Sequence, residues 1–272
     1  MKRFLRKYGA FAKGSFEVAV MYRVHILLWV FGDFFSLGLT ILLWVAIYAN
    51  SPTEMIRGFT LIQMIFYNLV IHLTGSITYM SPLSDVAEDY YDGRISMSLI
   101  KPASYAIQLF FRNLGNNLFS NLFITLPTFL LIAAVSLATH QTESLAWLSF
   151  PVFLFSSLLG LFINYFANFI FSNLVFYTDA TFGMFQLNQA IVRIFSGALI
   201  PLNFFPGWLR SLAGFLPYAG VQYIPAMILL GRTTGNDLLS AIGVQVLWVV
   251  FLGVAAQLVW SHSLSRMKVM GG

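Results

Sequence analysis

The sequence predicts an all-α membrane protein, and three observations lead to this fold class. The chain has 272 residues, of which 58% are hydrophobic and only 9% charged, with a mean hydropathy of +0.79. A soluble domain carries about 25% charged residues, so most of this surface must face something other than water, and lipid is the simplest candidate. Several apolar stretches are long enough to cross a bilayer. Cysteine is absent, which excludes disulfides, thiol catalysis and cysteine-ligated metals.

Six stretches reach the roughly 20 apolar residues that a membrane helix needs. The expected spans are residues 24–49, 59–79, 114–138, 147–177, 182–202 and 238–260. The fourth is long enough to tilt or to protrude from the bilayer. The sequence shows no internal repeat and no second domain, so residues 1–272 are expected to form one transmembrane domain.

The N-terminal segment, residues 1–23, has the pattern of a basic amphipathic helix. Phe4, Tyr8 and Phe11 recur at helical spacing, and five basic residues occupy positions between the apolar ones. Such a helix lies along the membrane surface, at the interface between lipid and water. An unstructured basic tail is the alternative. The segment lacks the apolar core of a cleaved signal.

Basic residues are distributed unequally between the two sides of this six-span arrangement. With the N-terminus inside, eleven lie on the cytoplasmic side, and three, Arg57, Arg210 and Arg232, lie outside. Because cytoplasmic loops carry the excess of Lys and Arg, both termini are expected in the cytoplasm. The formal net charge of +5 fits such loops beside anionic lipid headgroups, and we do not expect a nucleic-acid partner.

The largest cytoplasmic connection contains the stretch SDVAEDYYDGRISMSLIKP, and residues 82–102 form the candidate segment. Pro82 at its start, acids in the early turns and Gly93 as a stop predict a short helix. Its polar face is either a solvated surface or a docking surface for a soluble partner. Four of the ten acidic residues of the chain fall within eight positions of it, namely Asp85, Glu88, Asp89 and Asp92.

The sequence contains no pattern of a catalytic or metal site. It has no G-x-x-x-x-G-K-[ST], G-x-S-x-G or H-E-x-x-H motif. Its four histidines are scattered, and the acidic cluster lacks the spacing of a calcium loop. We therefore expect no enzyme active site, no metal and no bound cofactor in this chain.

Polar residues inside the expected spans are functional candidates, because burying them in a bilayer is costly. Such stripes either make hydrogen bonds between helices or line a water-accessible path. They comprise Asn113, Asn117, Asn121 and Thr125 on the third span, Asn164, Asn168 and Asn173 on the fourth, and Gln186, Asn188, Gln189 and Arg193 on the fifth.

Asp33 and Arg193 are the charges deepest in the expected spans. At 1.5 Å per residue they lie roughly 13 Å and roughly 16 Å from the cytoplasmic ends of their helices. Their similar depth permits an ion pair between the first and fifth spans, which would lower the cost of burying either charge. The alternative is that Arg193 binds an anionic substrate or backbone carbonyls.

Residues 203–232, the connection before the last span, are too apolar for an exposed loop, yet prolines interrupt them too often for a span. We expect short re-entrant or interfacial helices at the outer leaflet, with Trp208, Tyr218 and Tyr223 at the level of the lipid headgroups.

These features together resemble the permease subunits of type-2 ATP-binding-cassette exporters, and most of all the subgroup of half-size permeases encoded apart from their ATPase. Asp92-Gly93-Arg94-Ile95 followed by Leu99-Ile100-Lys101-Pro102 looks like the family pattern of a "GxI" element before an "LxxP" element after the second span. A second recurring block, the re-entrant motif, runs from the end of the expected span 182–202 into residues 203–232. It is matched by Ser196-Gly197, Pro201, Phe205-Pro206 and Leu216-Pro217.

The resemblance implies a coupling helix after the second span, which seats in a groove of a separate ATPase that binds ATP and Mg. It also implies a translocation path between two permeases, identical or related, lined by the first, second and fifth spans. By this analogy Asp85, Glu88, Asp89, Tyr90, Asp92, Gly93 and Arg94 contact the ATPase. Asp33, Gln186, Gln189 and Arg193 belong to the path, and the asparagines of the third and fourth spans become structural.

The function expected from the resemblance is export of an amphipathic, drug-like or lipidic compound across the inner membrane of a bacterium, with ATP hydrolysed by the partner. A polysaccharide or glycolipid exporter is the alternative within this class. An ATP-independent channel, a membrane anchor for a signalling complex and an intramembrane enzyme are alternatives from other classes. A nucleotide-binding partner that co-purifies at fixed stoichiometry would distinguish them.

Overall fold

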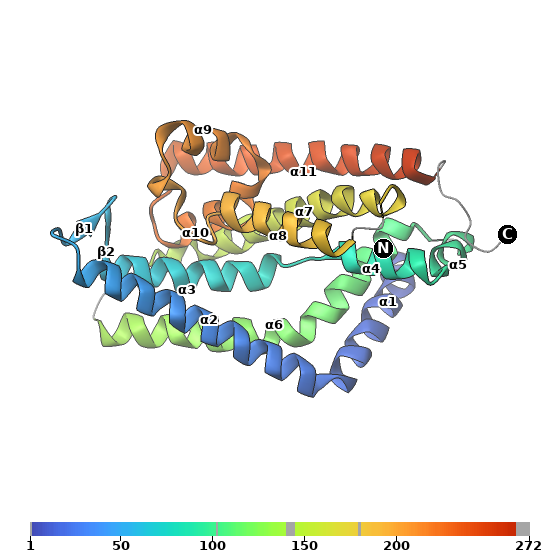
Figure 1. Ribbon diagram of the computed structural model, residues 1–272, viewed down its shortest axis with the longest axis horizontal. Coiled ribbons are helices and arrows are strands. Elements are labelled where there is room, and N and C mark those ends of the chain that lie inside the picture. The colour runs from blue at the N-terminus through green and yellow to red at the C-terminus, as the bar shows by residue number, and fades with distance from the viewer. Residues whose placement is uncertain (1, 102, 140–144, 179–180, 265–272) are drawn as a thin grey trace.

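The computed structural model of the protein describes residues 2–101, 103–139, 145–178 and 181–264 as an elongated bundle of helices (Figure 1). Eleven α-helices occur in these residues: α1 (Lys2–Met21), α2 (Arg23–Ala49), α3 (Leu61–Thr78), α4 (Pro82–Tyr91), α5 (Arg94–Ile100), α6 (Tyr105–Ala138), α7 (Phe150–Ser172), α8 (Thr181–Phe195), α9 (Gly207–Phe215), α10 (Tyr223–Leu229) and α11 (Gly235–Leu264).

Short elements fill several connections between these helices. Strands β1 (Met55–Ile56) and β2 (Phe59–Thr60) form an antiparallel hairpin in which Met55 pairs with Thr60. Four short 3-10 helices also occur: η2 (Trp147–Ser149), η3 (Asn173–Phe176), η4 (Leu202–Phe204) and η5 (Pro217–Gly220).

Five helical segments in the described residues are long and apolar enough to cross a membrane, which confirms the all-α membrane class. They are Arg23–Ala49, Leu61–Tyr91, Asn121–Ala138, Phe150–Phe176 and Gly235–Leu264. A sixth is present if the pair Gly207–Phe215 and Pro217–Leu229, bent by 71°, is taken as one span. This bent pair lies where the sequence predicts short helices broken by prolines.

The expected span over residues 182–202 needs a correction, because its helix is shorter. Helix α8 has 15 residues and ends at Phe195, which gives it a length of roughly 22 Å against a hydrocarbon core of roughly 30 Å. Gly197 follows with a φ of 78°, a left-handed conformation that a helix cannot continue through. The Tyr67 hydroxyl donates a hydrogen bond to the Gly197 carbonyl at 2.7 Å and holds this turn against α3.

Helix α3 lies at the centre of the bundle and has the densest packing. It begins with a capping box, in which the Thr60 hydroxyl accepts from the backbone N–H of Gln63 and the Gln63 side chain accepts from that of Thr60. Its Phe66, Tyr67 and Val70 are almost fully buried. Helix α2 lies at the edge instead.

Helix α2 buries only Val30, Leu37 and Trp44, which are seven residues apart. This spacing places the three side chains on one narrow stripe of the helix. The rest of α2 is exposed in the single chain, including Leu28, Phe31 and several other large apolar side chains. Most of its surface is therefore left for lipid or for a partner.

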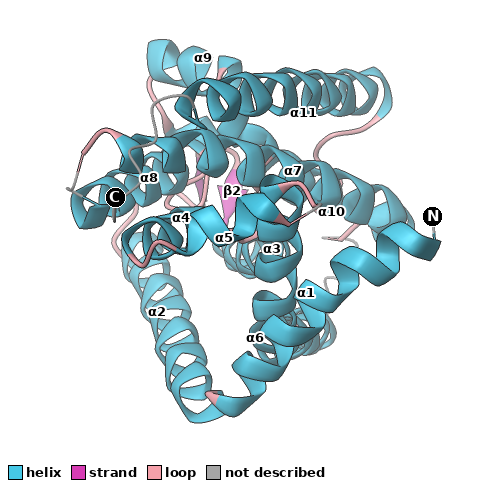
Figure 2. Cartoon of the chain, turned by 90° about the vertical axis from the view of Figure 1, so that its right-hand side faces the viewer, coloured by secondary structure: helices cyan, strands magenta, loops and turns pink. Residues whose placement is uncertain are grey.

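The predicted N-terminal helix is present as α1, and it packs along α6 (Figure 2). Tyr8 is buried and its hydroxyl accepts a hydrogen bond from the backbone N–H of Ser104. At Gly115 of α6 a Cβ atom would lie 2.0 Å from the carbonyl oxygen of Ala12. The contact therefore requires glycine at this position. Tyr8 and Ala19 of α1 are buried against protein, whereas Phe4 and Val18 remain exposed.

The two ends of the bundle carry different elements (Figure 1). Helices α4 and α5 and the N-terminus lie at one end, while the β1–β2 hairpin and α9 lie towards the other. Arg57, between the two strands, and Arg210, in α9, are thus separated from the α4–α5 end. Two of the basic residues expected in the cytoplasm, Arg266 and Lys268, lie outside the described residues.

Candidate functional site

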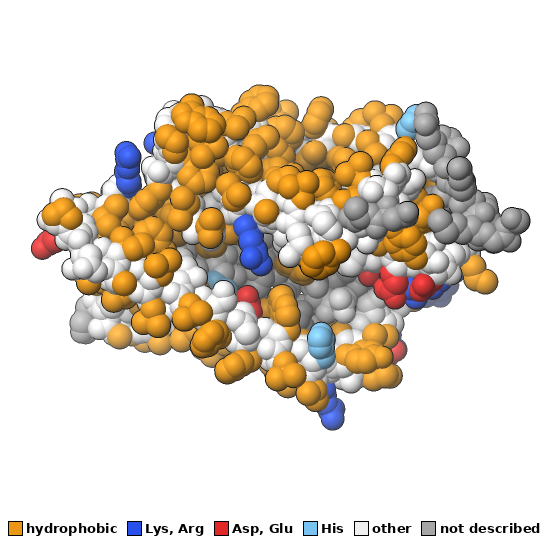
Figure 3. Space-filling view, viewed as in Figure 1, with side chains coloured by type: hydrophobic (Ala, Val, Ile, Leu, Met, Phe, Trp, Pro, Cys, Tyr) orange, Lys and Arg blue, Asp and Glu red, His pale blue; other side chains and the backbone are white. Residues whose placement is uncertain are grey.

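A cavity of about 700 Å³ opens between the helices in the middle of the bundle. Figure 3 shows a hollow on one face of the molecule, where charged and polar side chains interrupt an otherwise hydrophobic surface. The lining comes mainly from α2, α3, α6, α7 and α8. Eight of the lining side chains are amides, namely Asn68, Asn116, Asn117, Asn121, Asn164, Asn168, Gln189 and Gln222.

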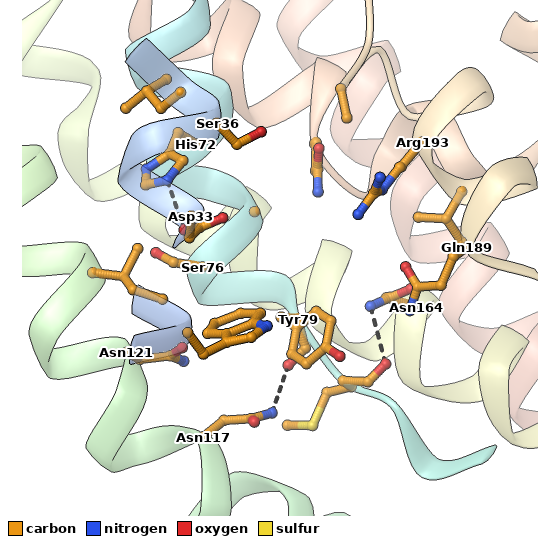
Figure 4. A pocket seen from close by; sticks show the side chains of 18 of the residues that line it. Asp33, Ser36, His72, Ser76, Tyr79, Asn117, Asn121, Asn164, Gln189 and Arg193 are labelled. Carbon is orange, nitrogen blue, oxygen red and sulfur yellow. Dashed lines mark hydrogen bonds and ion pairs between the residues drawn. The ribbon is translucent and has the colours of Figure 1, made fainter. Parts of the chain in front are cut away.

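Asp33, on α2, forms its ion pair with His72 of α3 (Figure 4). The Asp33 Oδ2 atom lies 2.8 Å from His72 Nε2, and His72 Nδ1 lies 3.0 Å from the Thr128 hydroxyl on α6. Three helices are therefore joined by one chain of hydrogen bonds at the cavity wall. The His72 side chain is 12% exposed and that of Asp33 is 33% exposed, so this chain of bonds borders the cavity.

Thr128 extends this chain of hydrogen bonds within α6. Its hydroxyl lies 2.7 Å from the Ile124 carbonyl and 3.0 Å from His72 Nδ1. Asp33 therefore has a hydrogen-bonding partner in the cavity wall, and that partner is itself held in place by α6.

Arg193 lies on the opposite wall, on α8, with its guanidinium directed into the cavity (Figure 4). It makes no hydrogen bond or ion pair through its side chain with any described residue. The hypothesis of an Asp33–Arg193 ion pair is therefore wrong for the single chain. Asp33 and Arg193 lie at similar depths along their helices, but depth alone does not say which side chains face each other. The residue that contacts Asp33 is His72 of the neighbouring α3.

The asparagine stripes make hydrogen bonds between helices and also line the cavity. Asn117 donates to the Tyr79 carbonyl and Asn164 donates to the Thr78 carbonyl, each at 2.9 Å. These carbonyls lie where α3 ends, so the amides satisfy backbone groups that the helix leaves unpaired. Asn168 bonds to both Asn164 and Asn188, which links α7 to α8.

The other expected path residues divide between the cavity and the outer surface. Gln189 lines the cavity. Gln186, one turn earlier on α8, is exposed and does not belong to the lining. The sequence places both on the fifth span, but only the packing of α8 against α7 decides which one faces inward.

The acidic stretch forms α4, and its carboxylates bind two arginines at the α4–α5 end. Asp89 accepts from Arg112 at 2.6 Å and from the Tyr105 hydroxyl at 2.9 Å, both on α6. Asp85 lies 3.7 Å from Arg112 and accepts from Asn113 at 2.6 Å. These contacts clamp α4 onto the start of α6.

Burial, with the Asp89 carboxylate beside it, raises the pKa of Tyr105, which keeps its hydroxyl protonated as a donor. Burial opposes the charge of Arg112, but the hydrogen bond and charge of Asp89 outweigh it and raise its pKa. Tyr105 and Arg112 therefore stay protonated over the physiological pH range and serve as donors to Asp89.

One expectation for the acidic residues is wrong, because Asp89 does not face outward. Its side chain is only 3% exposed, whereas those of Glu88 and Asp92 are 61% and 56% exposed and both bind Arg94. Tyr90 is partly buried against Phe176. Neighbouring acidic residues of α4 therefore differ in burial, and the sequence of the acidic run does not show which one faces inward.

The exposed surface of α4 and α5 combines charged and apolar side chains. We call Glu88, Asp92, Arg94, Met97 and Ile100 the α4–α5 face. Met97 is 70% exposed and Ile100 is 84% exposed. Gly93, with a φ of 69°, makes the turn between the two helices. Lys101 follows α5, and Pro102 lies outside the described residues.

The residues of the predicted re-entrant motif lie at element boundaries. Pro201 precedes η4, Pro206 precedes α9 and Pro217 begins η5, so each proline stands where a helix starts. Gln245 of α11 is fully buried and donates to the Gly220 carbonyl at 2.7 Å and to the Ser156 carbonyl at 3.1 Å. The segment is thereby fixed to α7 and α11.

Sequence reasoning missed four residues of these arrangements: His72, Thr128, Tyr105 and Arg112. His72 and Thr128 are polar positions inside apolar spans, a signal that could have found them as candidates. Nothing in the sequence indicates that Arg112 and Tyr105 bind Asp89, since 16 to 23 positions separate them from it.

Apolar helices long enough to span a membrane, around a polar cavity, are typical of multi-pass membrane proteins. The family comparison identifies which kind. The model of the ABC-2 family transporter protein matches residues 34–271, and the chain belongs to this family of type-2 permeases. None of the curated proteins compared with the chain matches it.

Proposed function

We propose that the chain is the membrane subunit of an ATP-driven exporter, and that it moves an amphipathic, drug-like or lipidic compound through the cavity. Membership of the ABC-2 family supports the transport class. The movement of a small compound through the chain is supported by the polar cavity of about 700 Å³, which lies between helices whose outer surfaces are apolar. Cavities of roughly 300–1,000 Å³ suit small organic ligands.

The energy source in this proposal is a separate cassette ATPase, which binds ATP and Mg and docks as a dimer on the α4–α5 face. The exposed Met97 and Ile100 supply apolar area, and Glu88, Asp92 and Arg94 supply charges at its edge. Such a mixture of an apolar centre and a polar rim is typical of protein interfaces. The α4–α6 clamp would transmit motion of this face to α6.

A second permease, identical or related, would complete the path across the exposed sides of α2 and α8. Helix α2 buries only its narrow stripe in the single chain, and α8 exposes Leu187 and Ile194. The proposal places the chain in the inner membrane of a bacterium with both termini in the cytoplasm. The basic residues of the N-terminal segment favour this orientation.

Export of a polysaccharide or glycolipid is a second candidate, which one observation favours. The cavity lining combines the eight amides with Trp29 and Tyr79. Amides can bind hydroxyl groups, and an aromatic face can cover the apolar side of a sugar ring. Stimulation of ATP hydrolysis by a glycan and not by a single-chain amphiphile would favour this candidate.

The test is purification of the tagged protein from its own host in mild detergent, followed by identification of the bound proteins. The proposal expects a cassette ATPase at equal stoichiometry, and reduced recovery of that ATPase with Asp92→Lys. Glu17→Lys is the matched control, because Glu17 is an exposed acid on α1. Recovery of the chain without any ATPase would favour a channel or a membrane anchor.

A further inference from the structure

We propose that the cavity binds the anionic headgroup of an amphiphile, with Arg193 as the residue that recognises the anion. The inference rests on the proposed function, because it names the substrate class for the same cavity. Three properties of the lining carry it: the pairing of its acidic side chain with His72, the unpaired guanidinium and the apolar surface beside it.

The lining carries one charge that has no partner among the described residues. Its acidic and basic side chains are His25, Asp33, His72 and Arg193. The Asp33 carboxylate is bonded to His72 Nε2, whereas the Arg193 guanidinium makes no hydrogen bond or ion pair with any described residue. An anionic ligand would therefore meet attraction at Arg193, and a cationic ligand repulsion.

Arg193 lies on α8 at the cavity wall, where an arginine without a bonding partner indicates a site for a ligand. An arginine in the membrane interior usually pairs with another residue or with backbone carbonyls, because its exposure to lipid is costly. No described residue fills this role for the Arg193 side chain, and Figure 4 shows the guanidinium directed into the cavity. Guanidinium binds phosphate and carboxylate through two parallel hydrogen bonds, so an oxyanion is the ligand that fits.

The remaining lining provides room for an apolar body. Leu37, Ile71, Ile124 and Val192 contribute apolar surface to the cavity lining, and Trp29 adds an aromatic ring. Amides such as Gln189 and Gln222 can donate further hydrogen bonds to the same headgroup. An anion with an attached alkyl chain would contact both the polar groups around Arg193 and the apolar side chains, whereas a small soluble anion would contact only the polar groups.

The test measures ligand-induced stabilisation of the full chain in lauryl maltoside micelles, from the midpoint of thermal unfolding. The probes are octyl phosphate, octyltrimethylammonium and inorganic phosphate. The proposal expects a concentration-dependent rise with octyl phosphate, at least tenfold weaker apparent binding of inorganic phosphate, and no rise with octyltrimethylammonium. A larger rise with octyltrimethylammonium would overturn the proposal, and an equal rise with inorganic phosphate would overturn its amphiphile part.

Variants locate the binding site. R193Q is expected to weaken octyl phosphate binding at least tenfold, and R193K is expected to retain part of it. R210Q is the matched control, since Arg210 is on α9, outside the cavity lining. Unchanged binding in R193Q, or equal loss in R210Q, would contradict the assignment. If R193Q does not fold, R193K and the three probes on the unaltered chain still decide.

The binding assay needs neither ATP nor a partner, so it can succeed or fail independently of the test of the exporter proposal. Failure to recover an ATPase would leave an anion site in a membrane protein of another kind. Absence of anion binding in a chain that does recruit an ATPase would leave an exporter of a different substrate. In that case an acidic residue of a second permease would be the partner of Arg193.

Discussion

The carboxylate of Asp33 lies 2.8 Å from the imidazole of His72, which joins α2 to α3 in the membrane interior. Arg193 lies across the cavity from this pair (Figure 4). The two charges that the sequence places at similar depth therefore have separate roles. Asp33 belongs to a hydrogen-bonded pair that holds helices together, and Arg193 is a cation without a partner among the described residues that line the cavity.

A double-mutant cycle tests the Asp33–His72 pair. The variants Asp33→Asn and His72→Gln are made alone and together, and their free energies of unfolding are measured in detergent. The expected coupling free energy is about 1–3 kcal/mol, because either single variant already removes the shared hydrogen bond and the double variant cannot remove it again. The matched cycle of Asp33→Asn with Arg193→Gln is expected to give a value near zero. A larger coupling with Arg193 than with His72 would contradict the pairing.

Neutralising Asp89 and neutralising Asp92 are expected to lower the free energy of unfolding by different amounts. Asp89→Asn removes a buried partner of Arg112 and is expected to lower the free energy of unfolding by about 3 kcal/mol. Asp92 is more than half exposed, so Asp92→Asn is expected to cost less than about 1 kcal/mol. Equal losses for both variants would mean that the carboxylate of Asp89 is not buried in a clamp.

The close approach of α1 and α6 predicts intolerance at Gly115. A Cβ there meets the Ala12 backbone, so Gly115→Ala is expected to displace α1 and to increase hydrogen exchange over residues 2–21. Gly243→Ala in α11 is the control, because nothing lies within 4 Å of its added Cβ. It is expected to be neutral or to stabilise the helix by up to about 1 kcal/mol. Unchanged exchange in Gly115→Ala would show that α1 does not pack as described.

Buried Gln245 predicts a local effect on the segment before α10. Gln245→Leu removes the donor for the carbonyls of Ser156 and Gly220 and is expected to cost about 1–3 kcal/mol. Hydrogen exchange should rise in residues 217–222 before it rises elsewhere. Gln257→Leu, at an exposed position of the same helix, is expected to leave this exchange unchanged. Equal effects of both variants would contradict the anchoring role of Gln245.

The apolar stretches were predictable because length and hydropathy alone define a membrane helix. The expected span 24–49 differs by one residue at its start from α2 (Arg23–Ala49), and the expected 59–79 contains α3 (Leu61–Thr78). The end of α8 was not predictable in the same way. Residues 196–202 stay apolar, and the chain leaves the helix through the left-handed Gly197 and its bond to Tyr67.

The candidate site was predictable as a set of residues and not as a set of contacts. Asp33, Gln189 and Arg193 stand out in the sequence as polar groups in apolar helices, and all three line the cavity. Their partners depend on which faces of the helices meet, which hydropathy does not encode. The same limit explains why Asp89, one acid among four, is the one buried against Arg112.

The central claim is that the α4–α5 face docks onto a soluble ATPase, and cross-linking tests it most directly. The natural chain has no cysteine, so Ile100→Cys carries the only thiol in the protein and can be labelled with a photoactivatable maleimide in native membranes. Leu148→Cys is the control, because Leu148 is 99% exposed in η2, an element outside the α4–α5 face.

The account predicts a light-dependent adduct between Ile100→Cys and a cassette ATPase, identified by mass spectrometry, and no such adduct from Leu148→Cys. An ATPase adduct of equal yield from both positions would contradict the docking face. Labelled Ile100→Cys that captures no ATPase in membranes active in ATP-driven export would contradict the central claim itself.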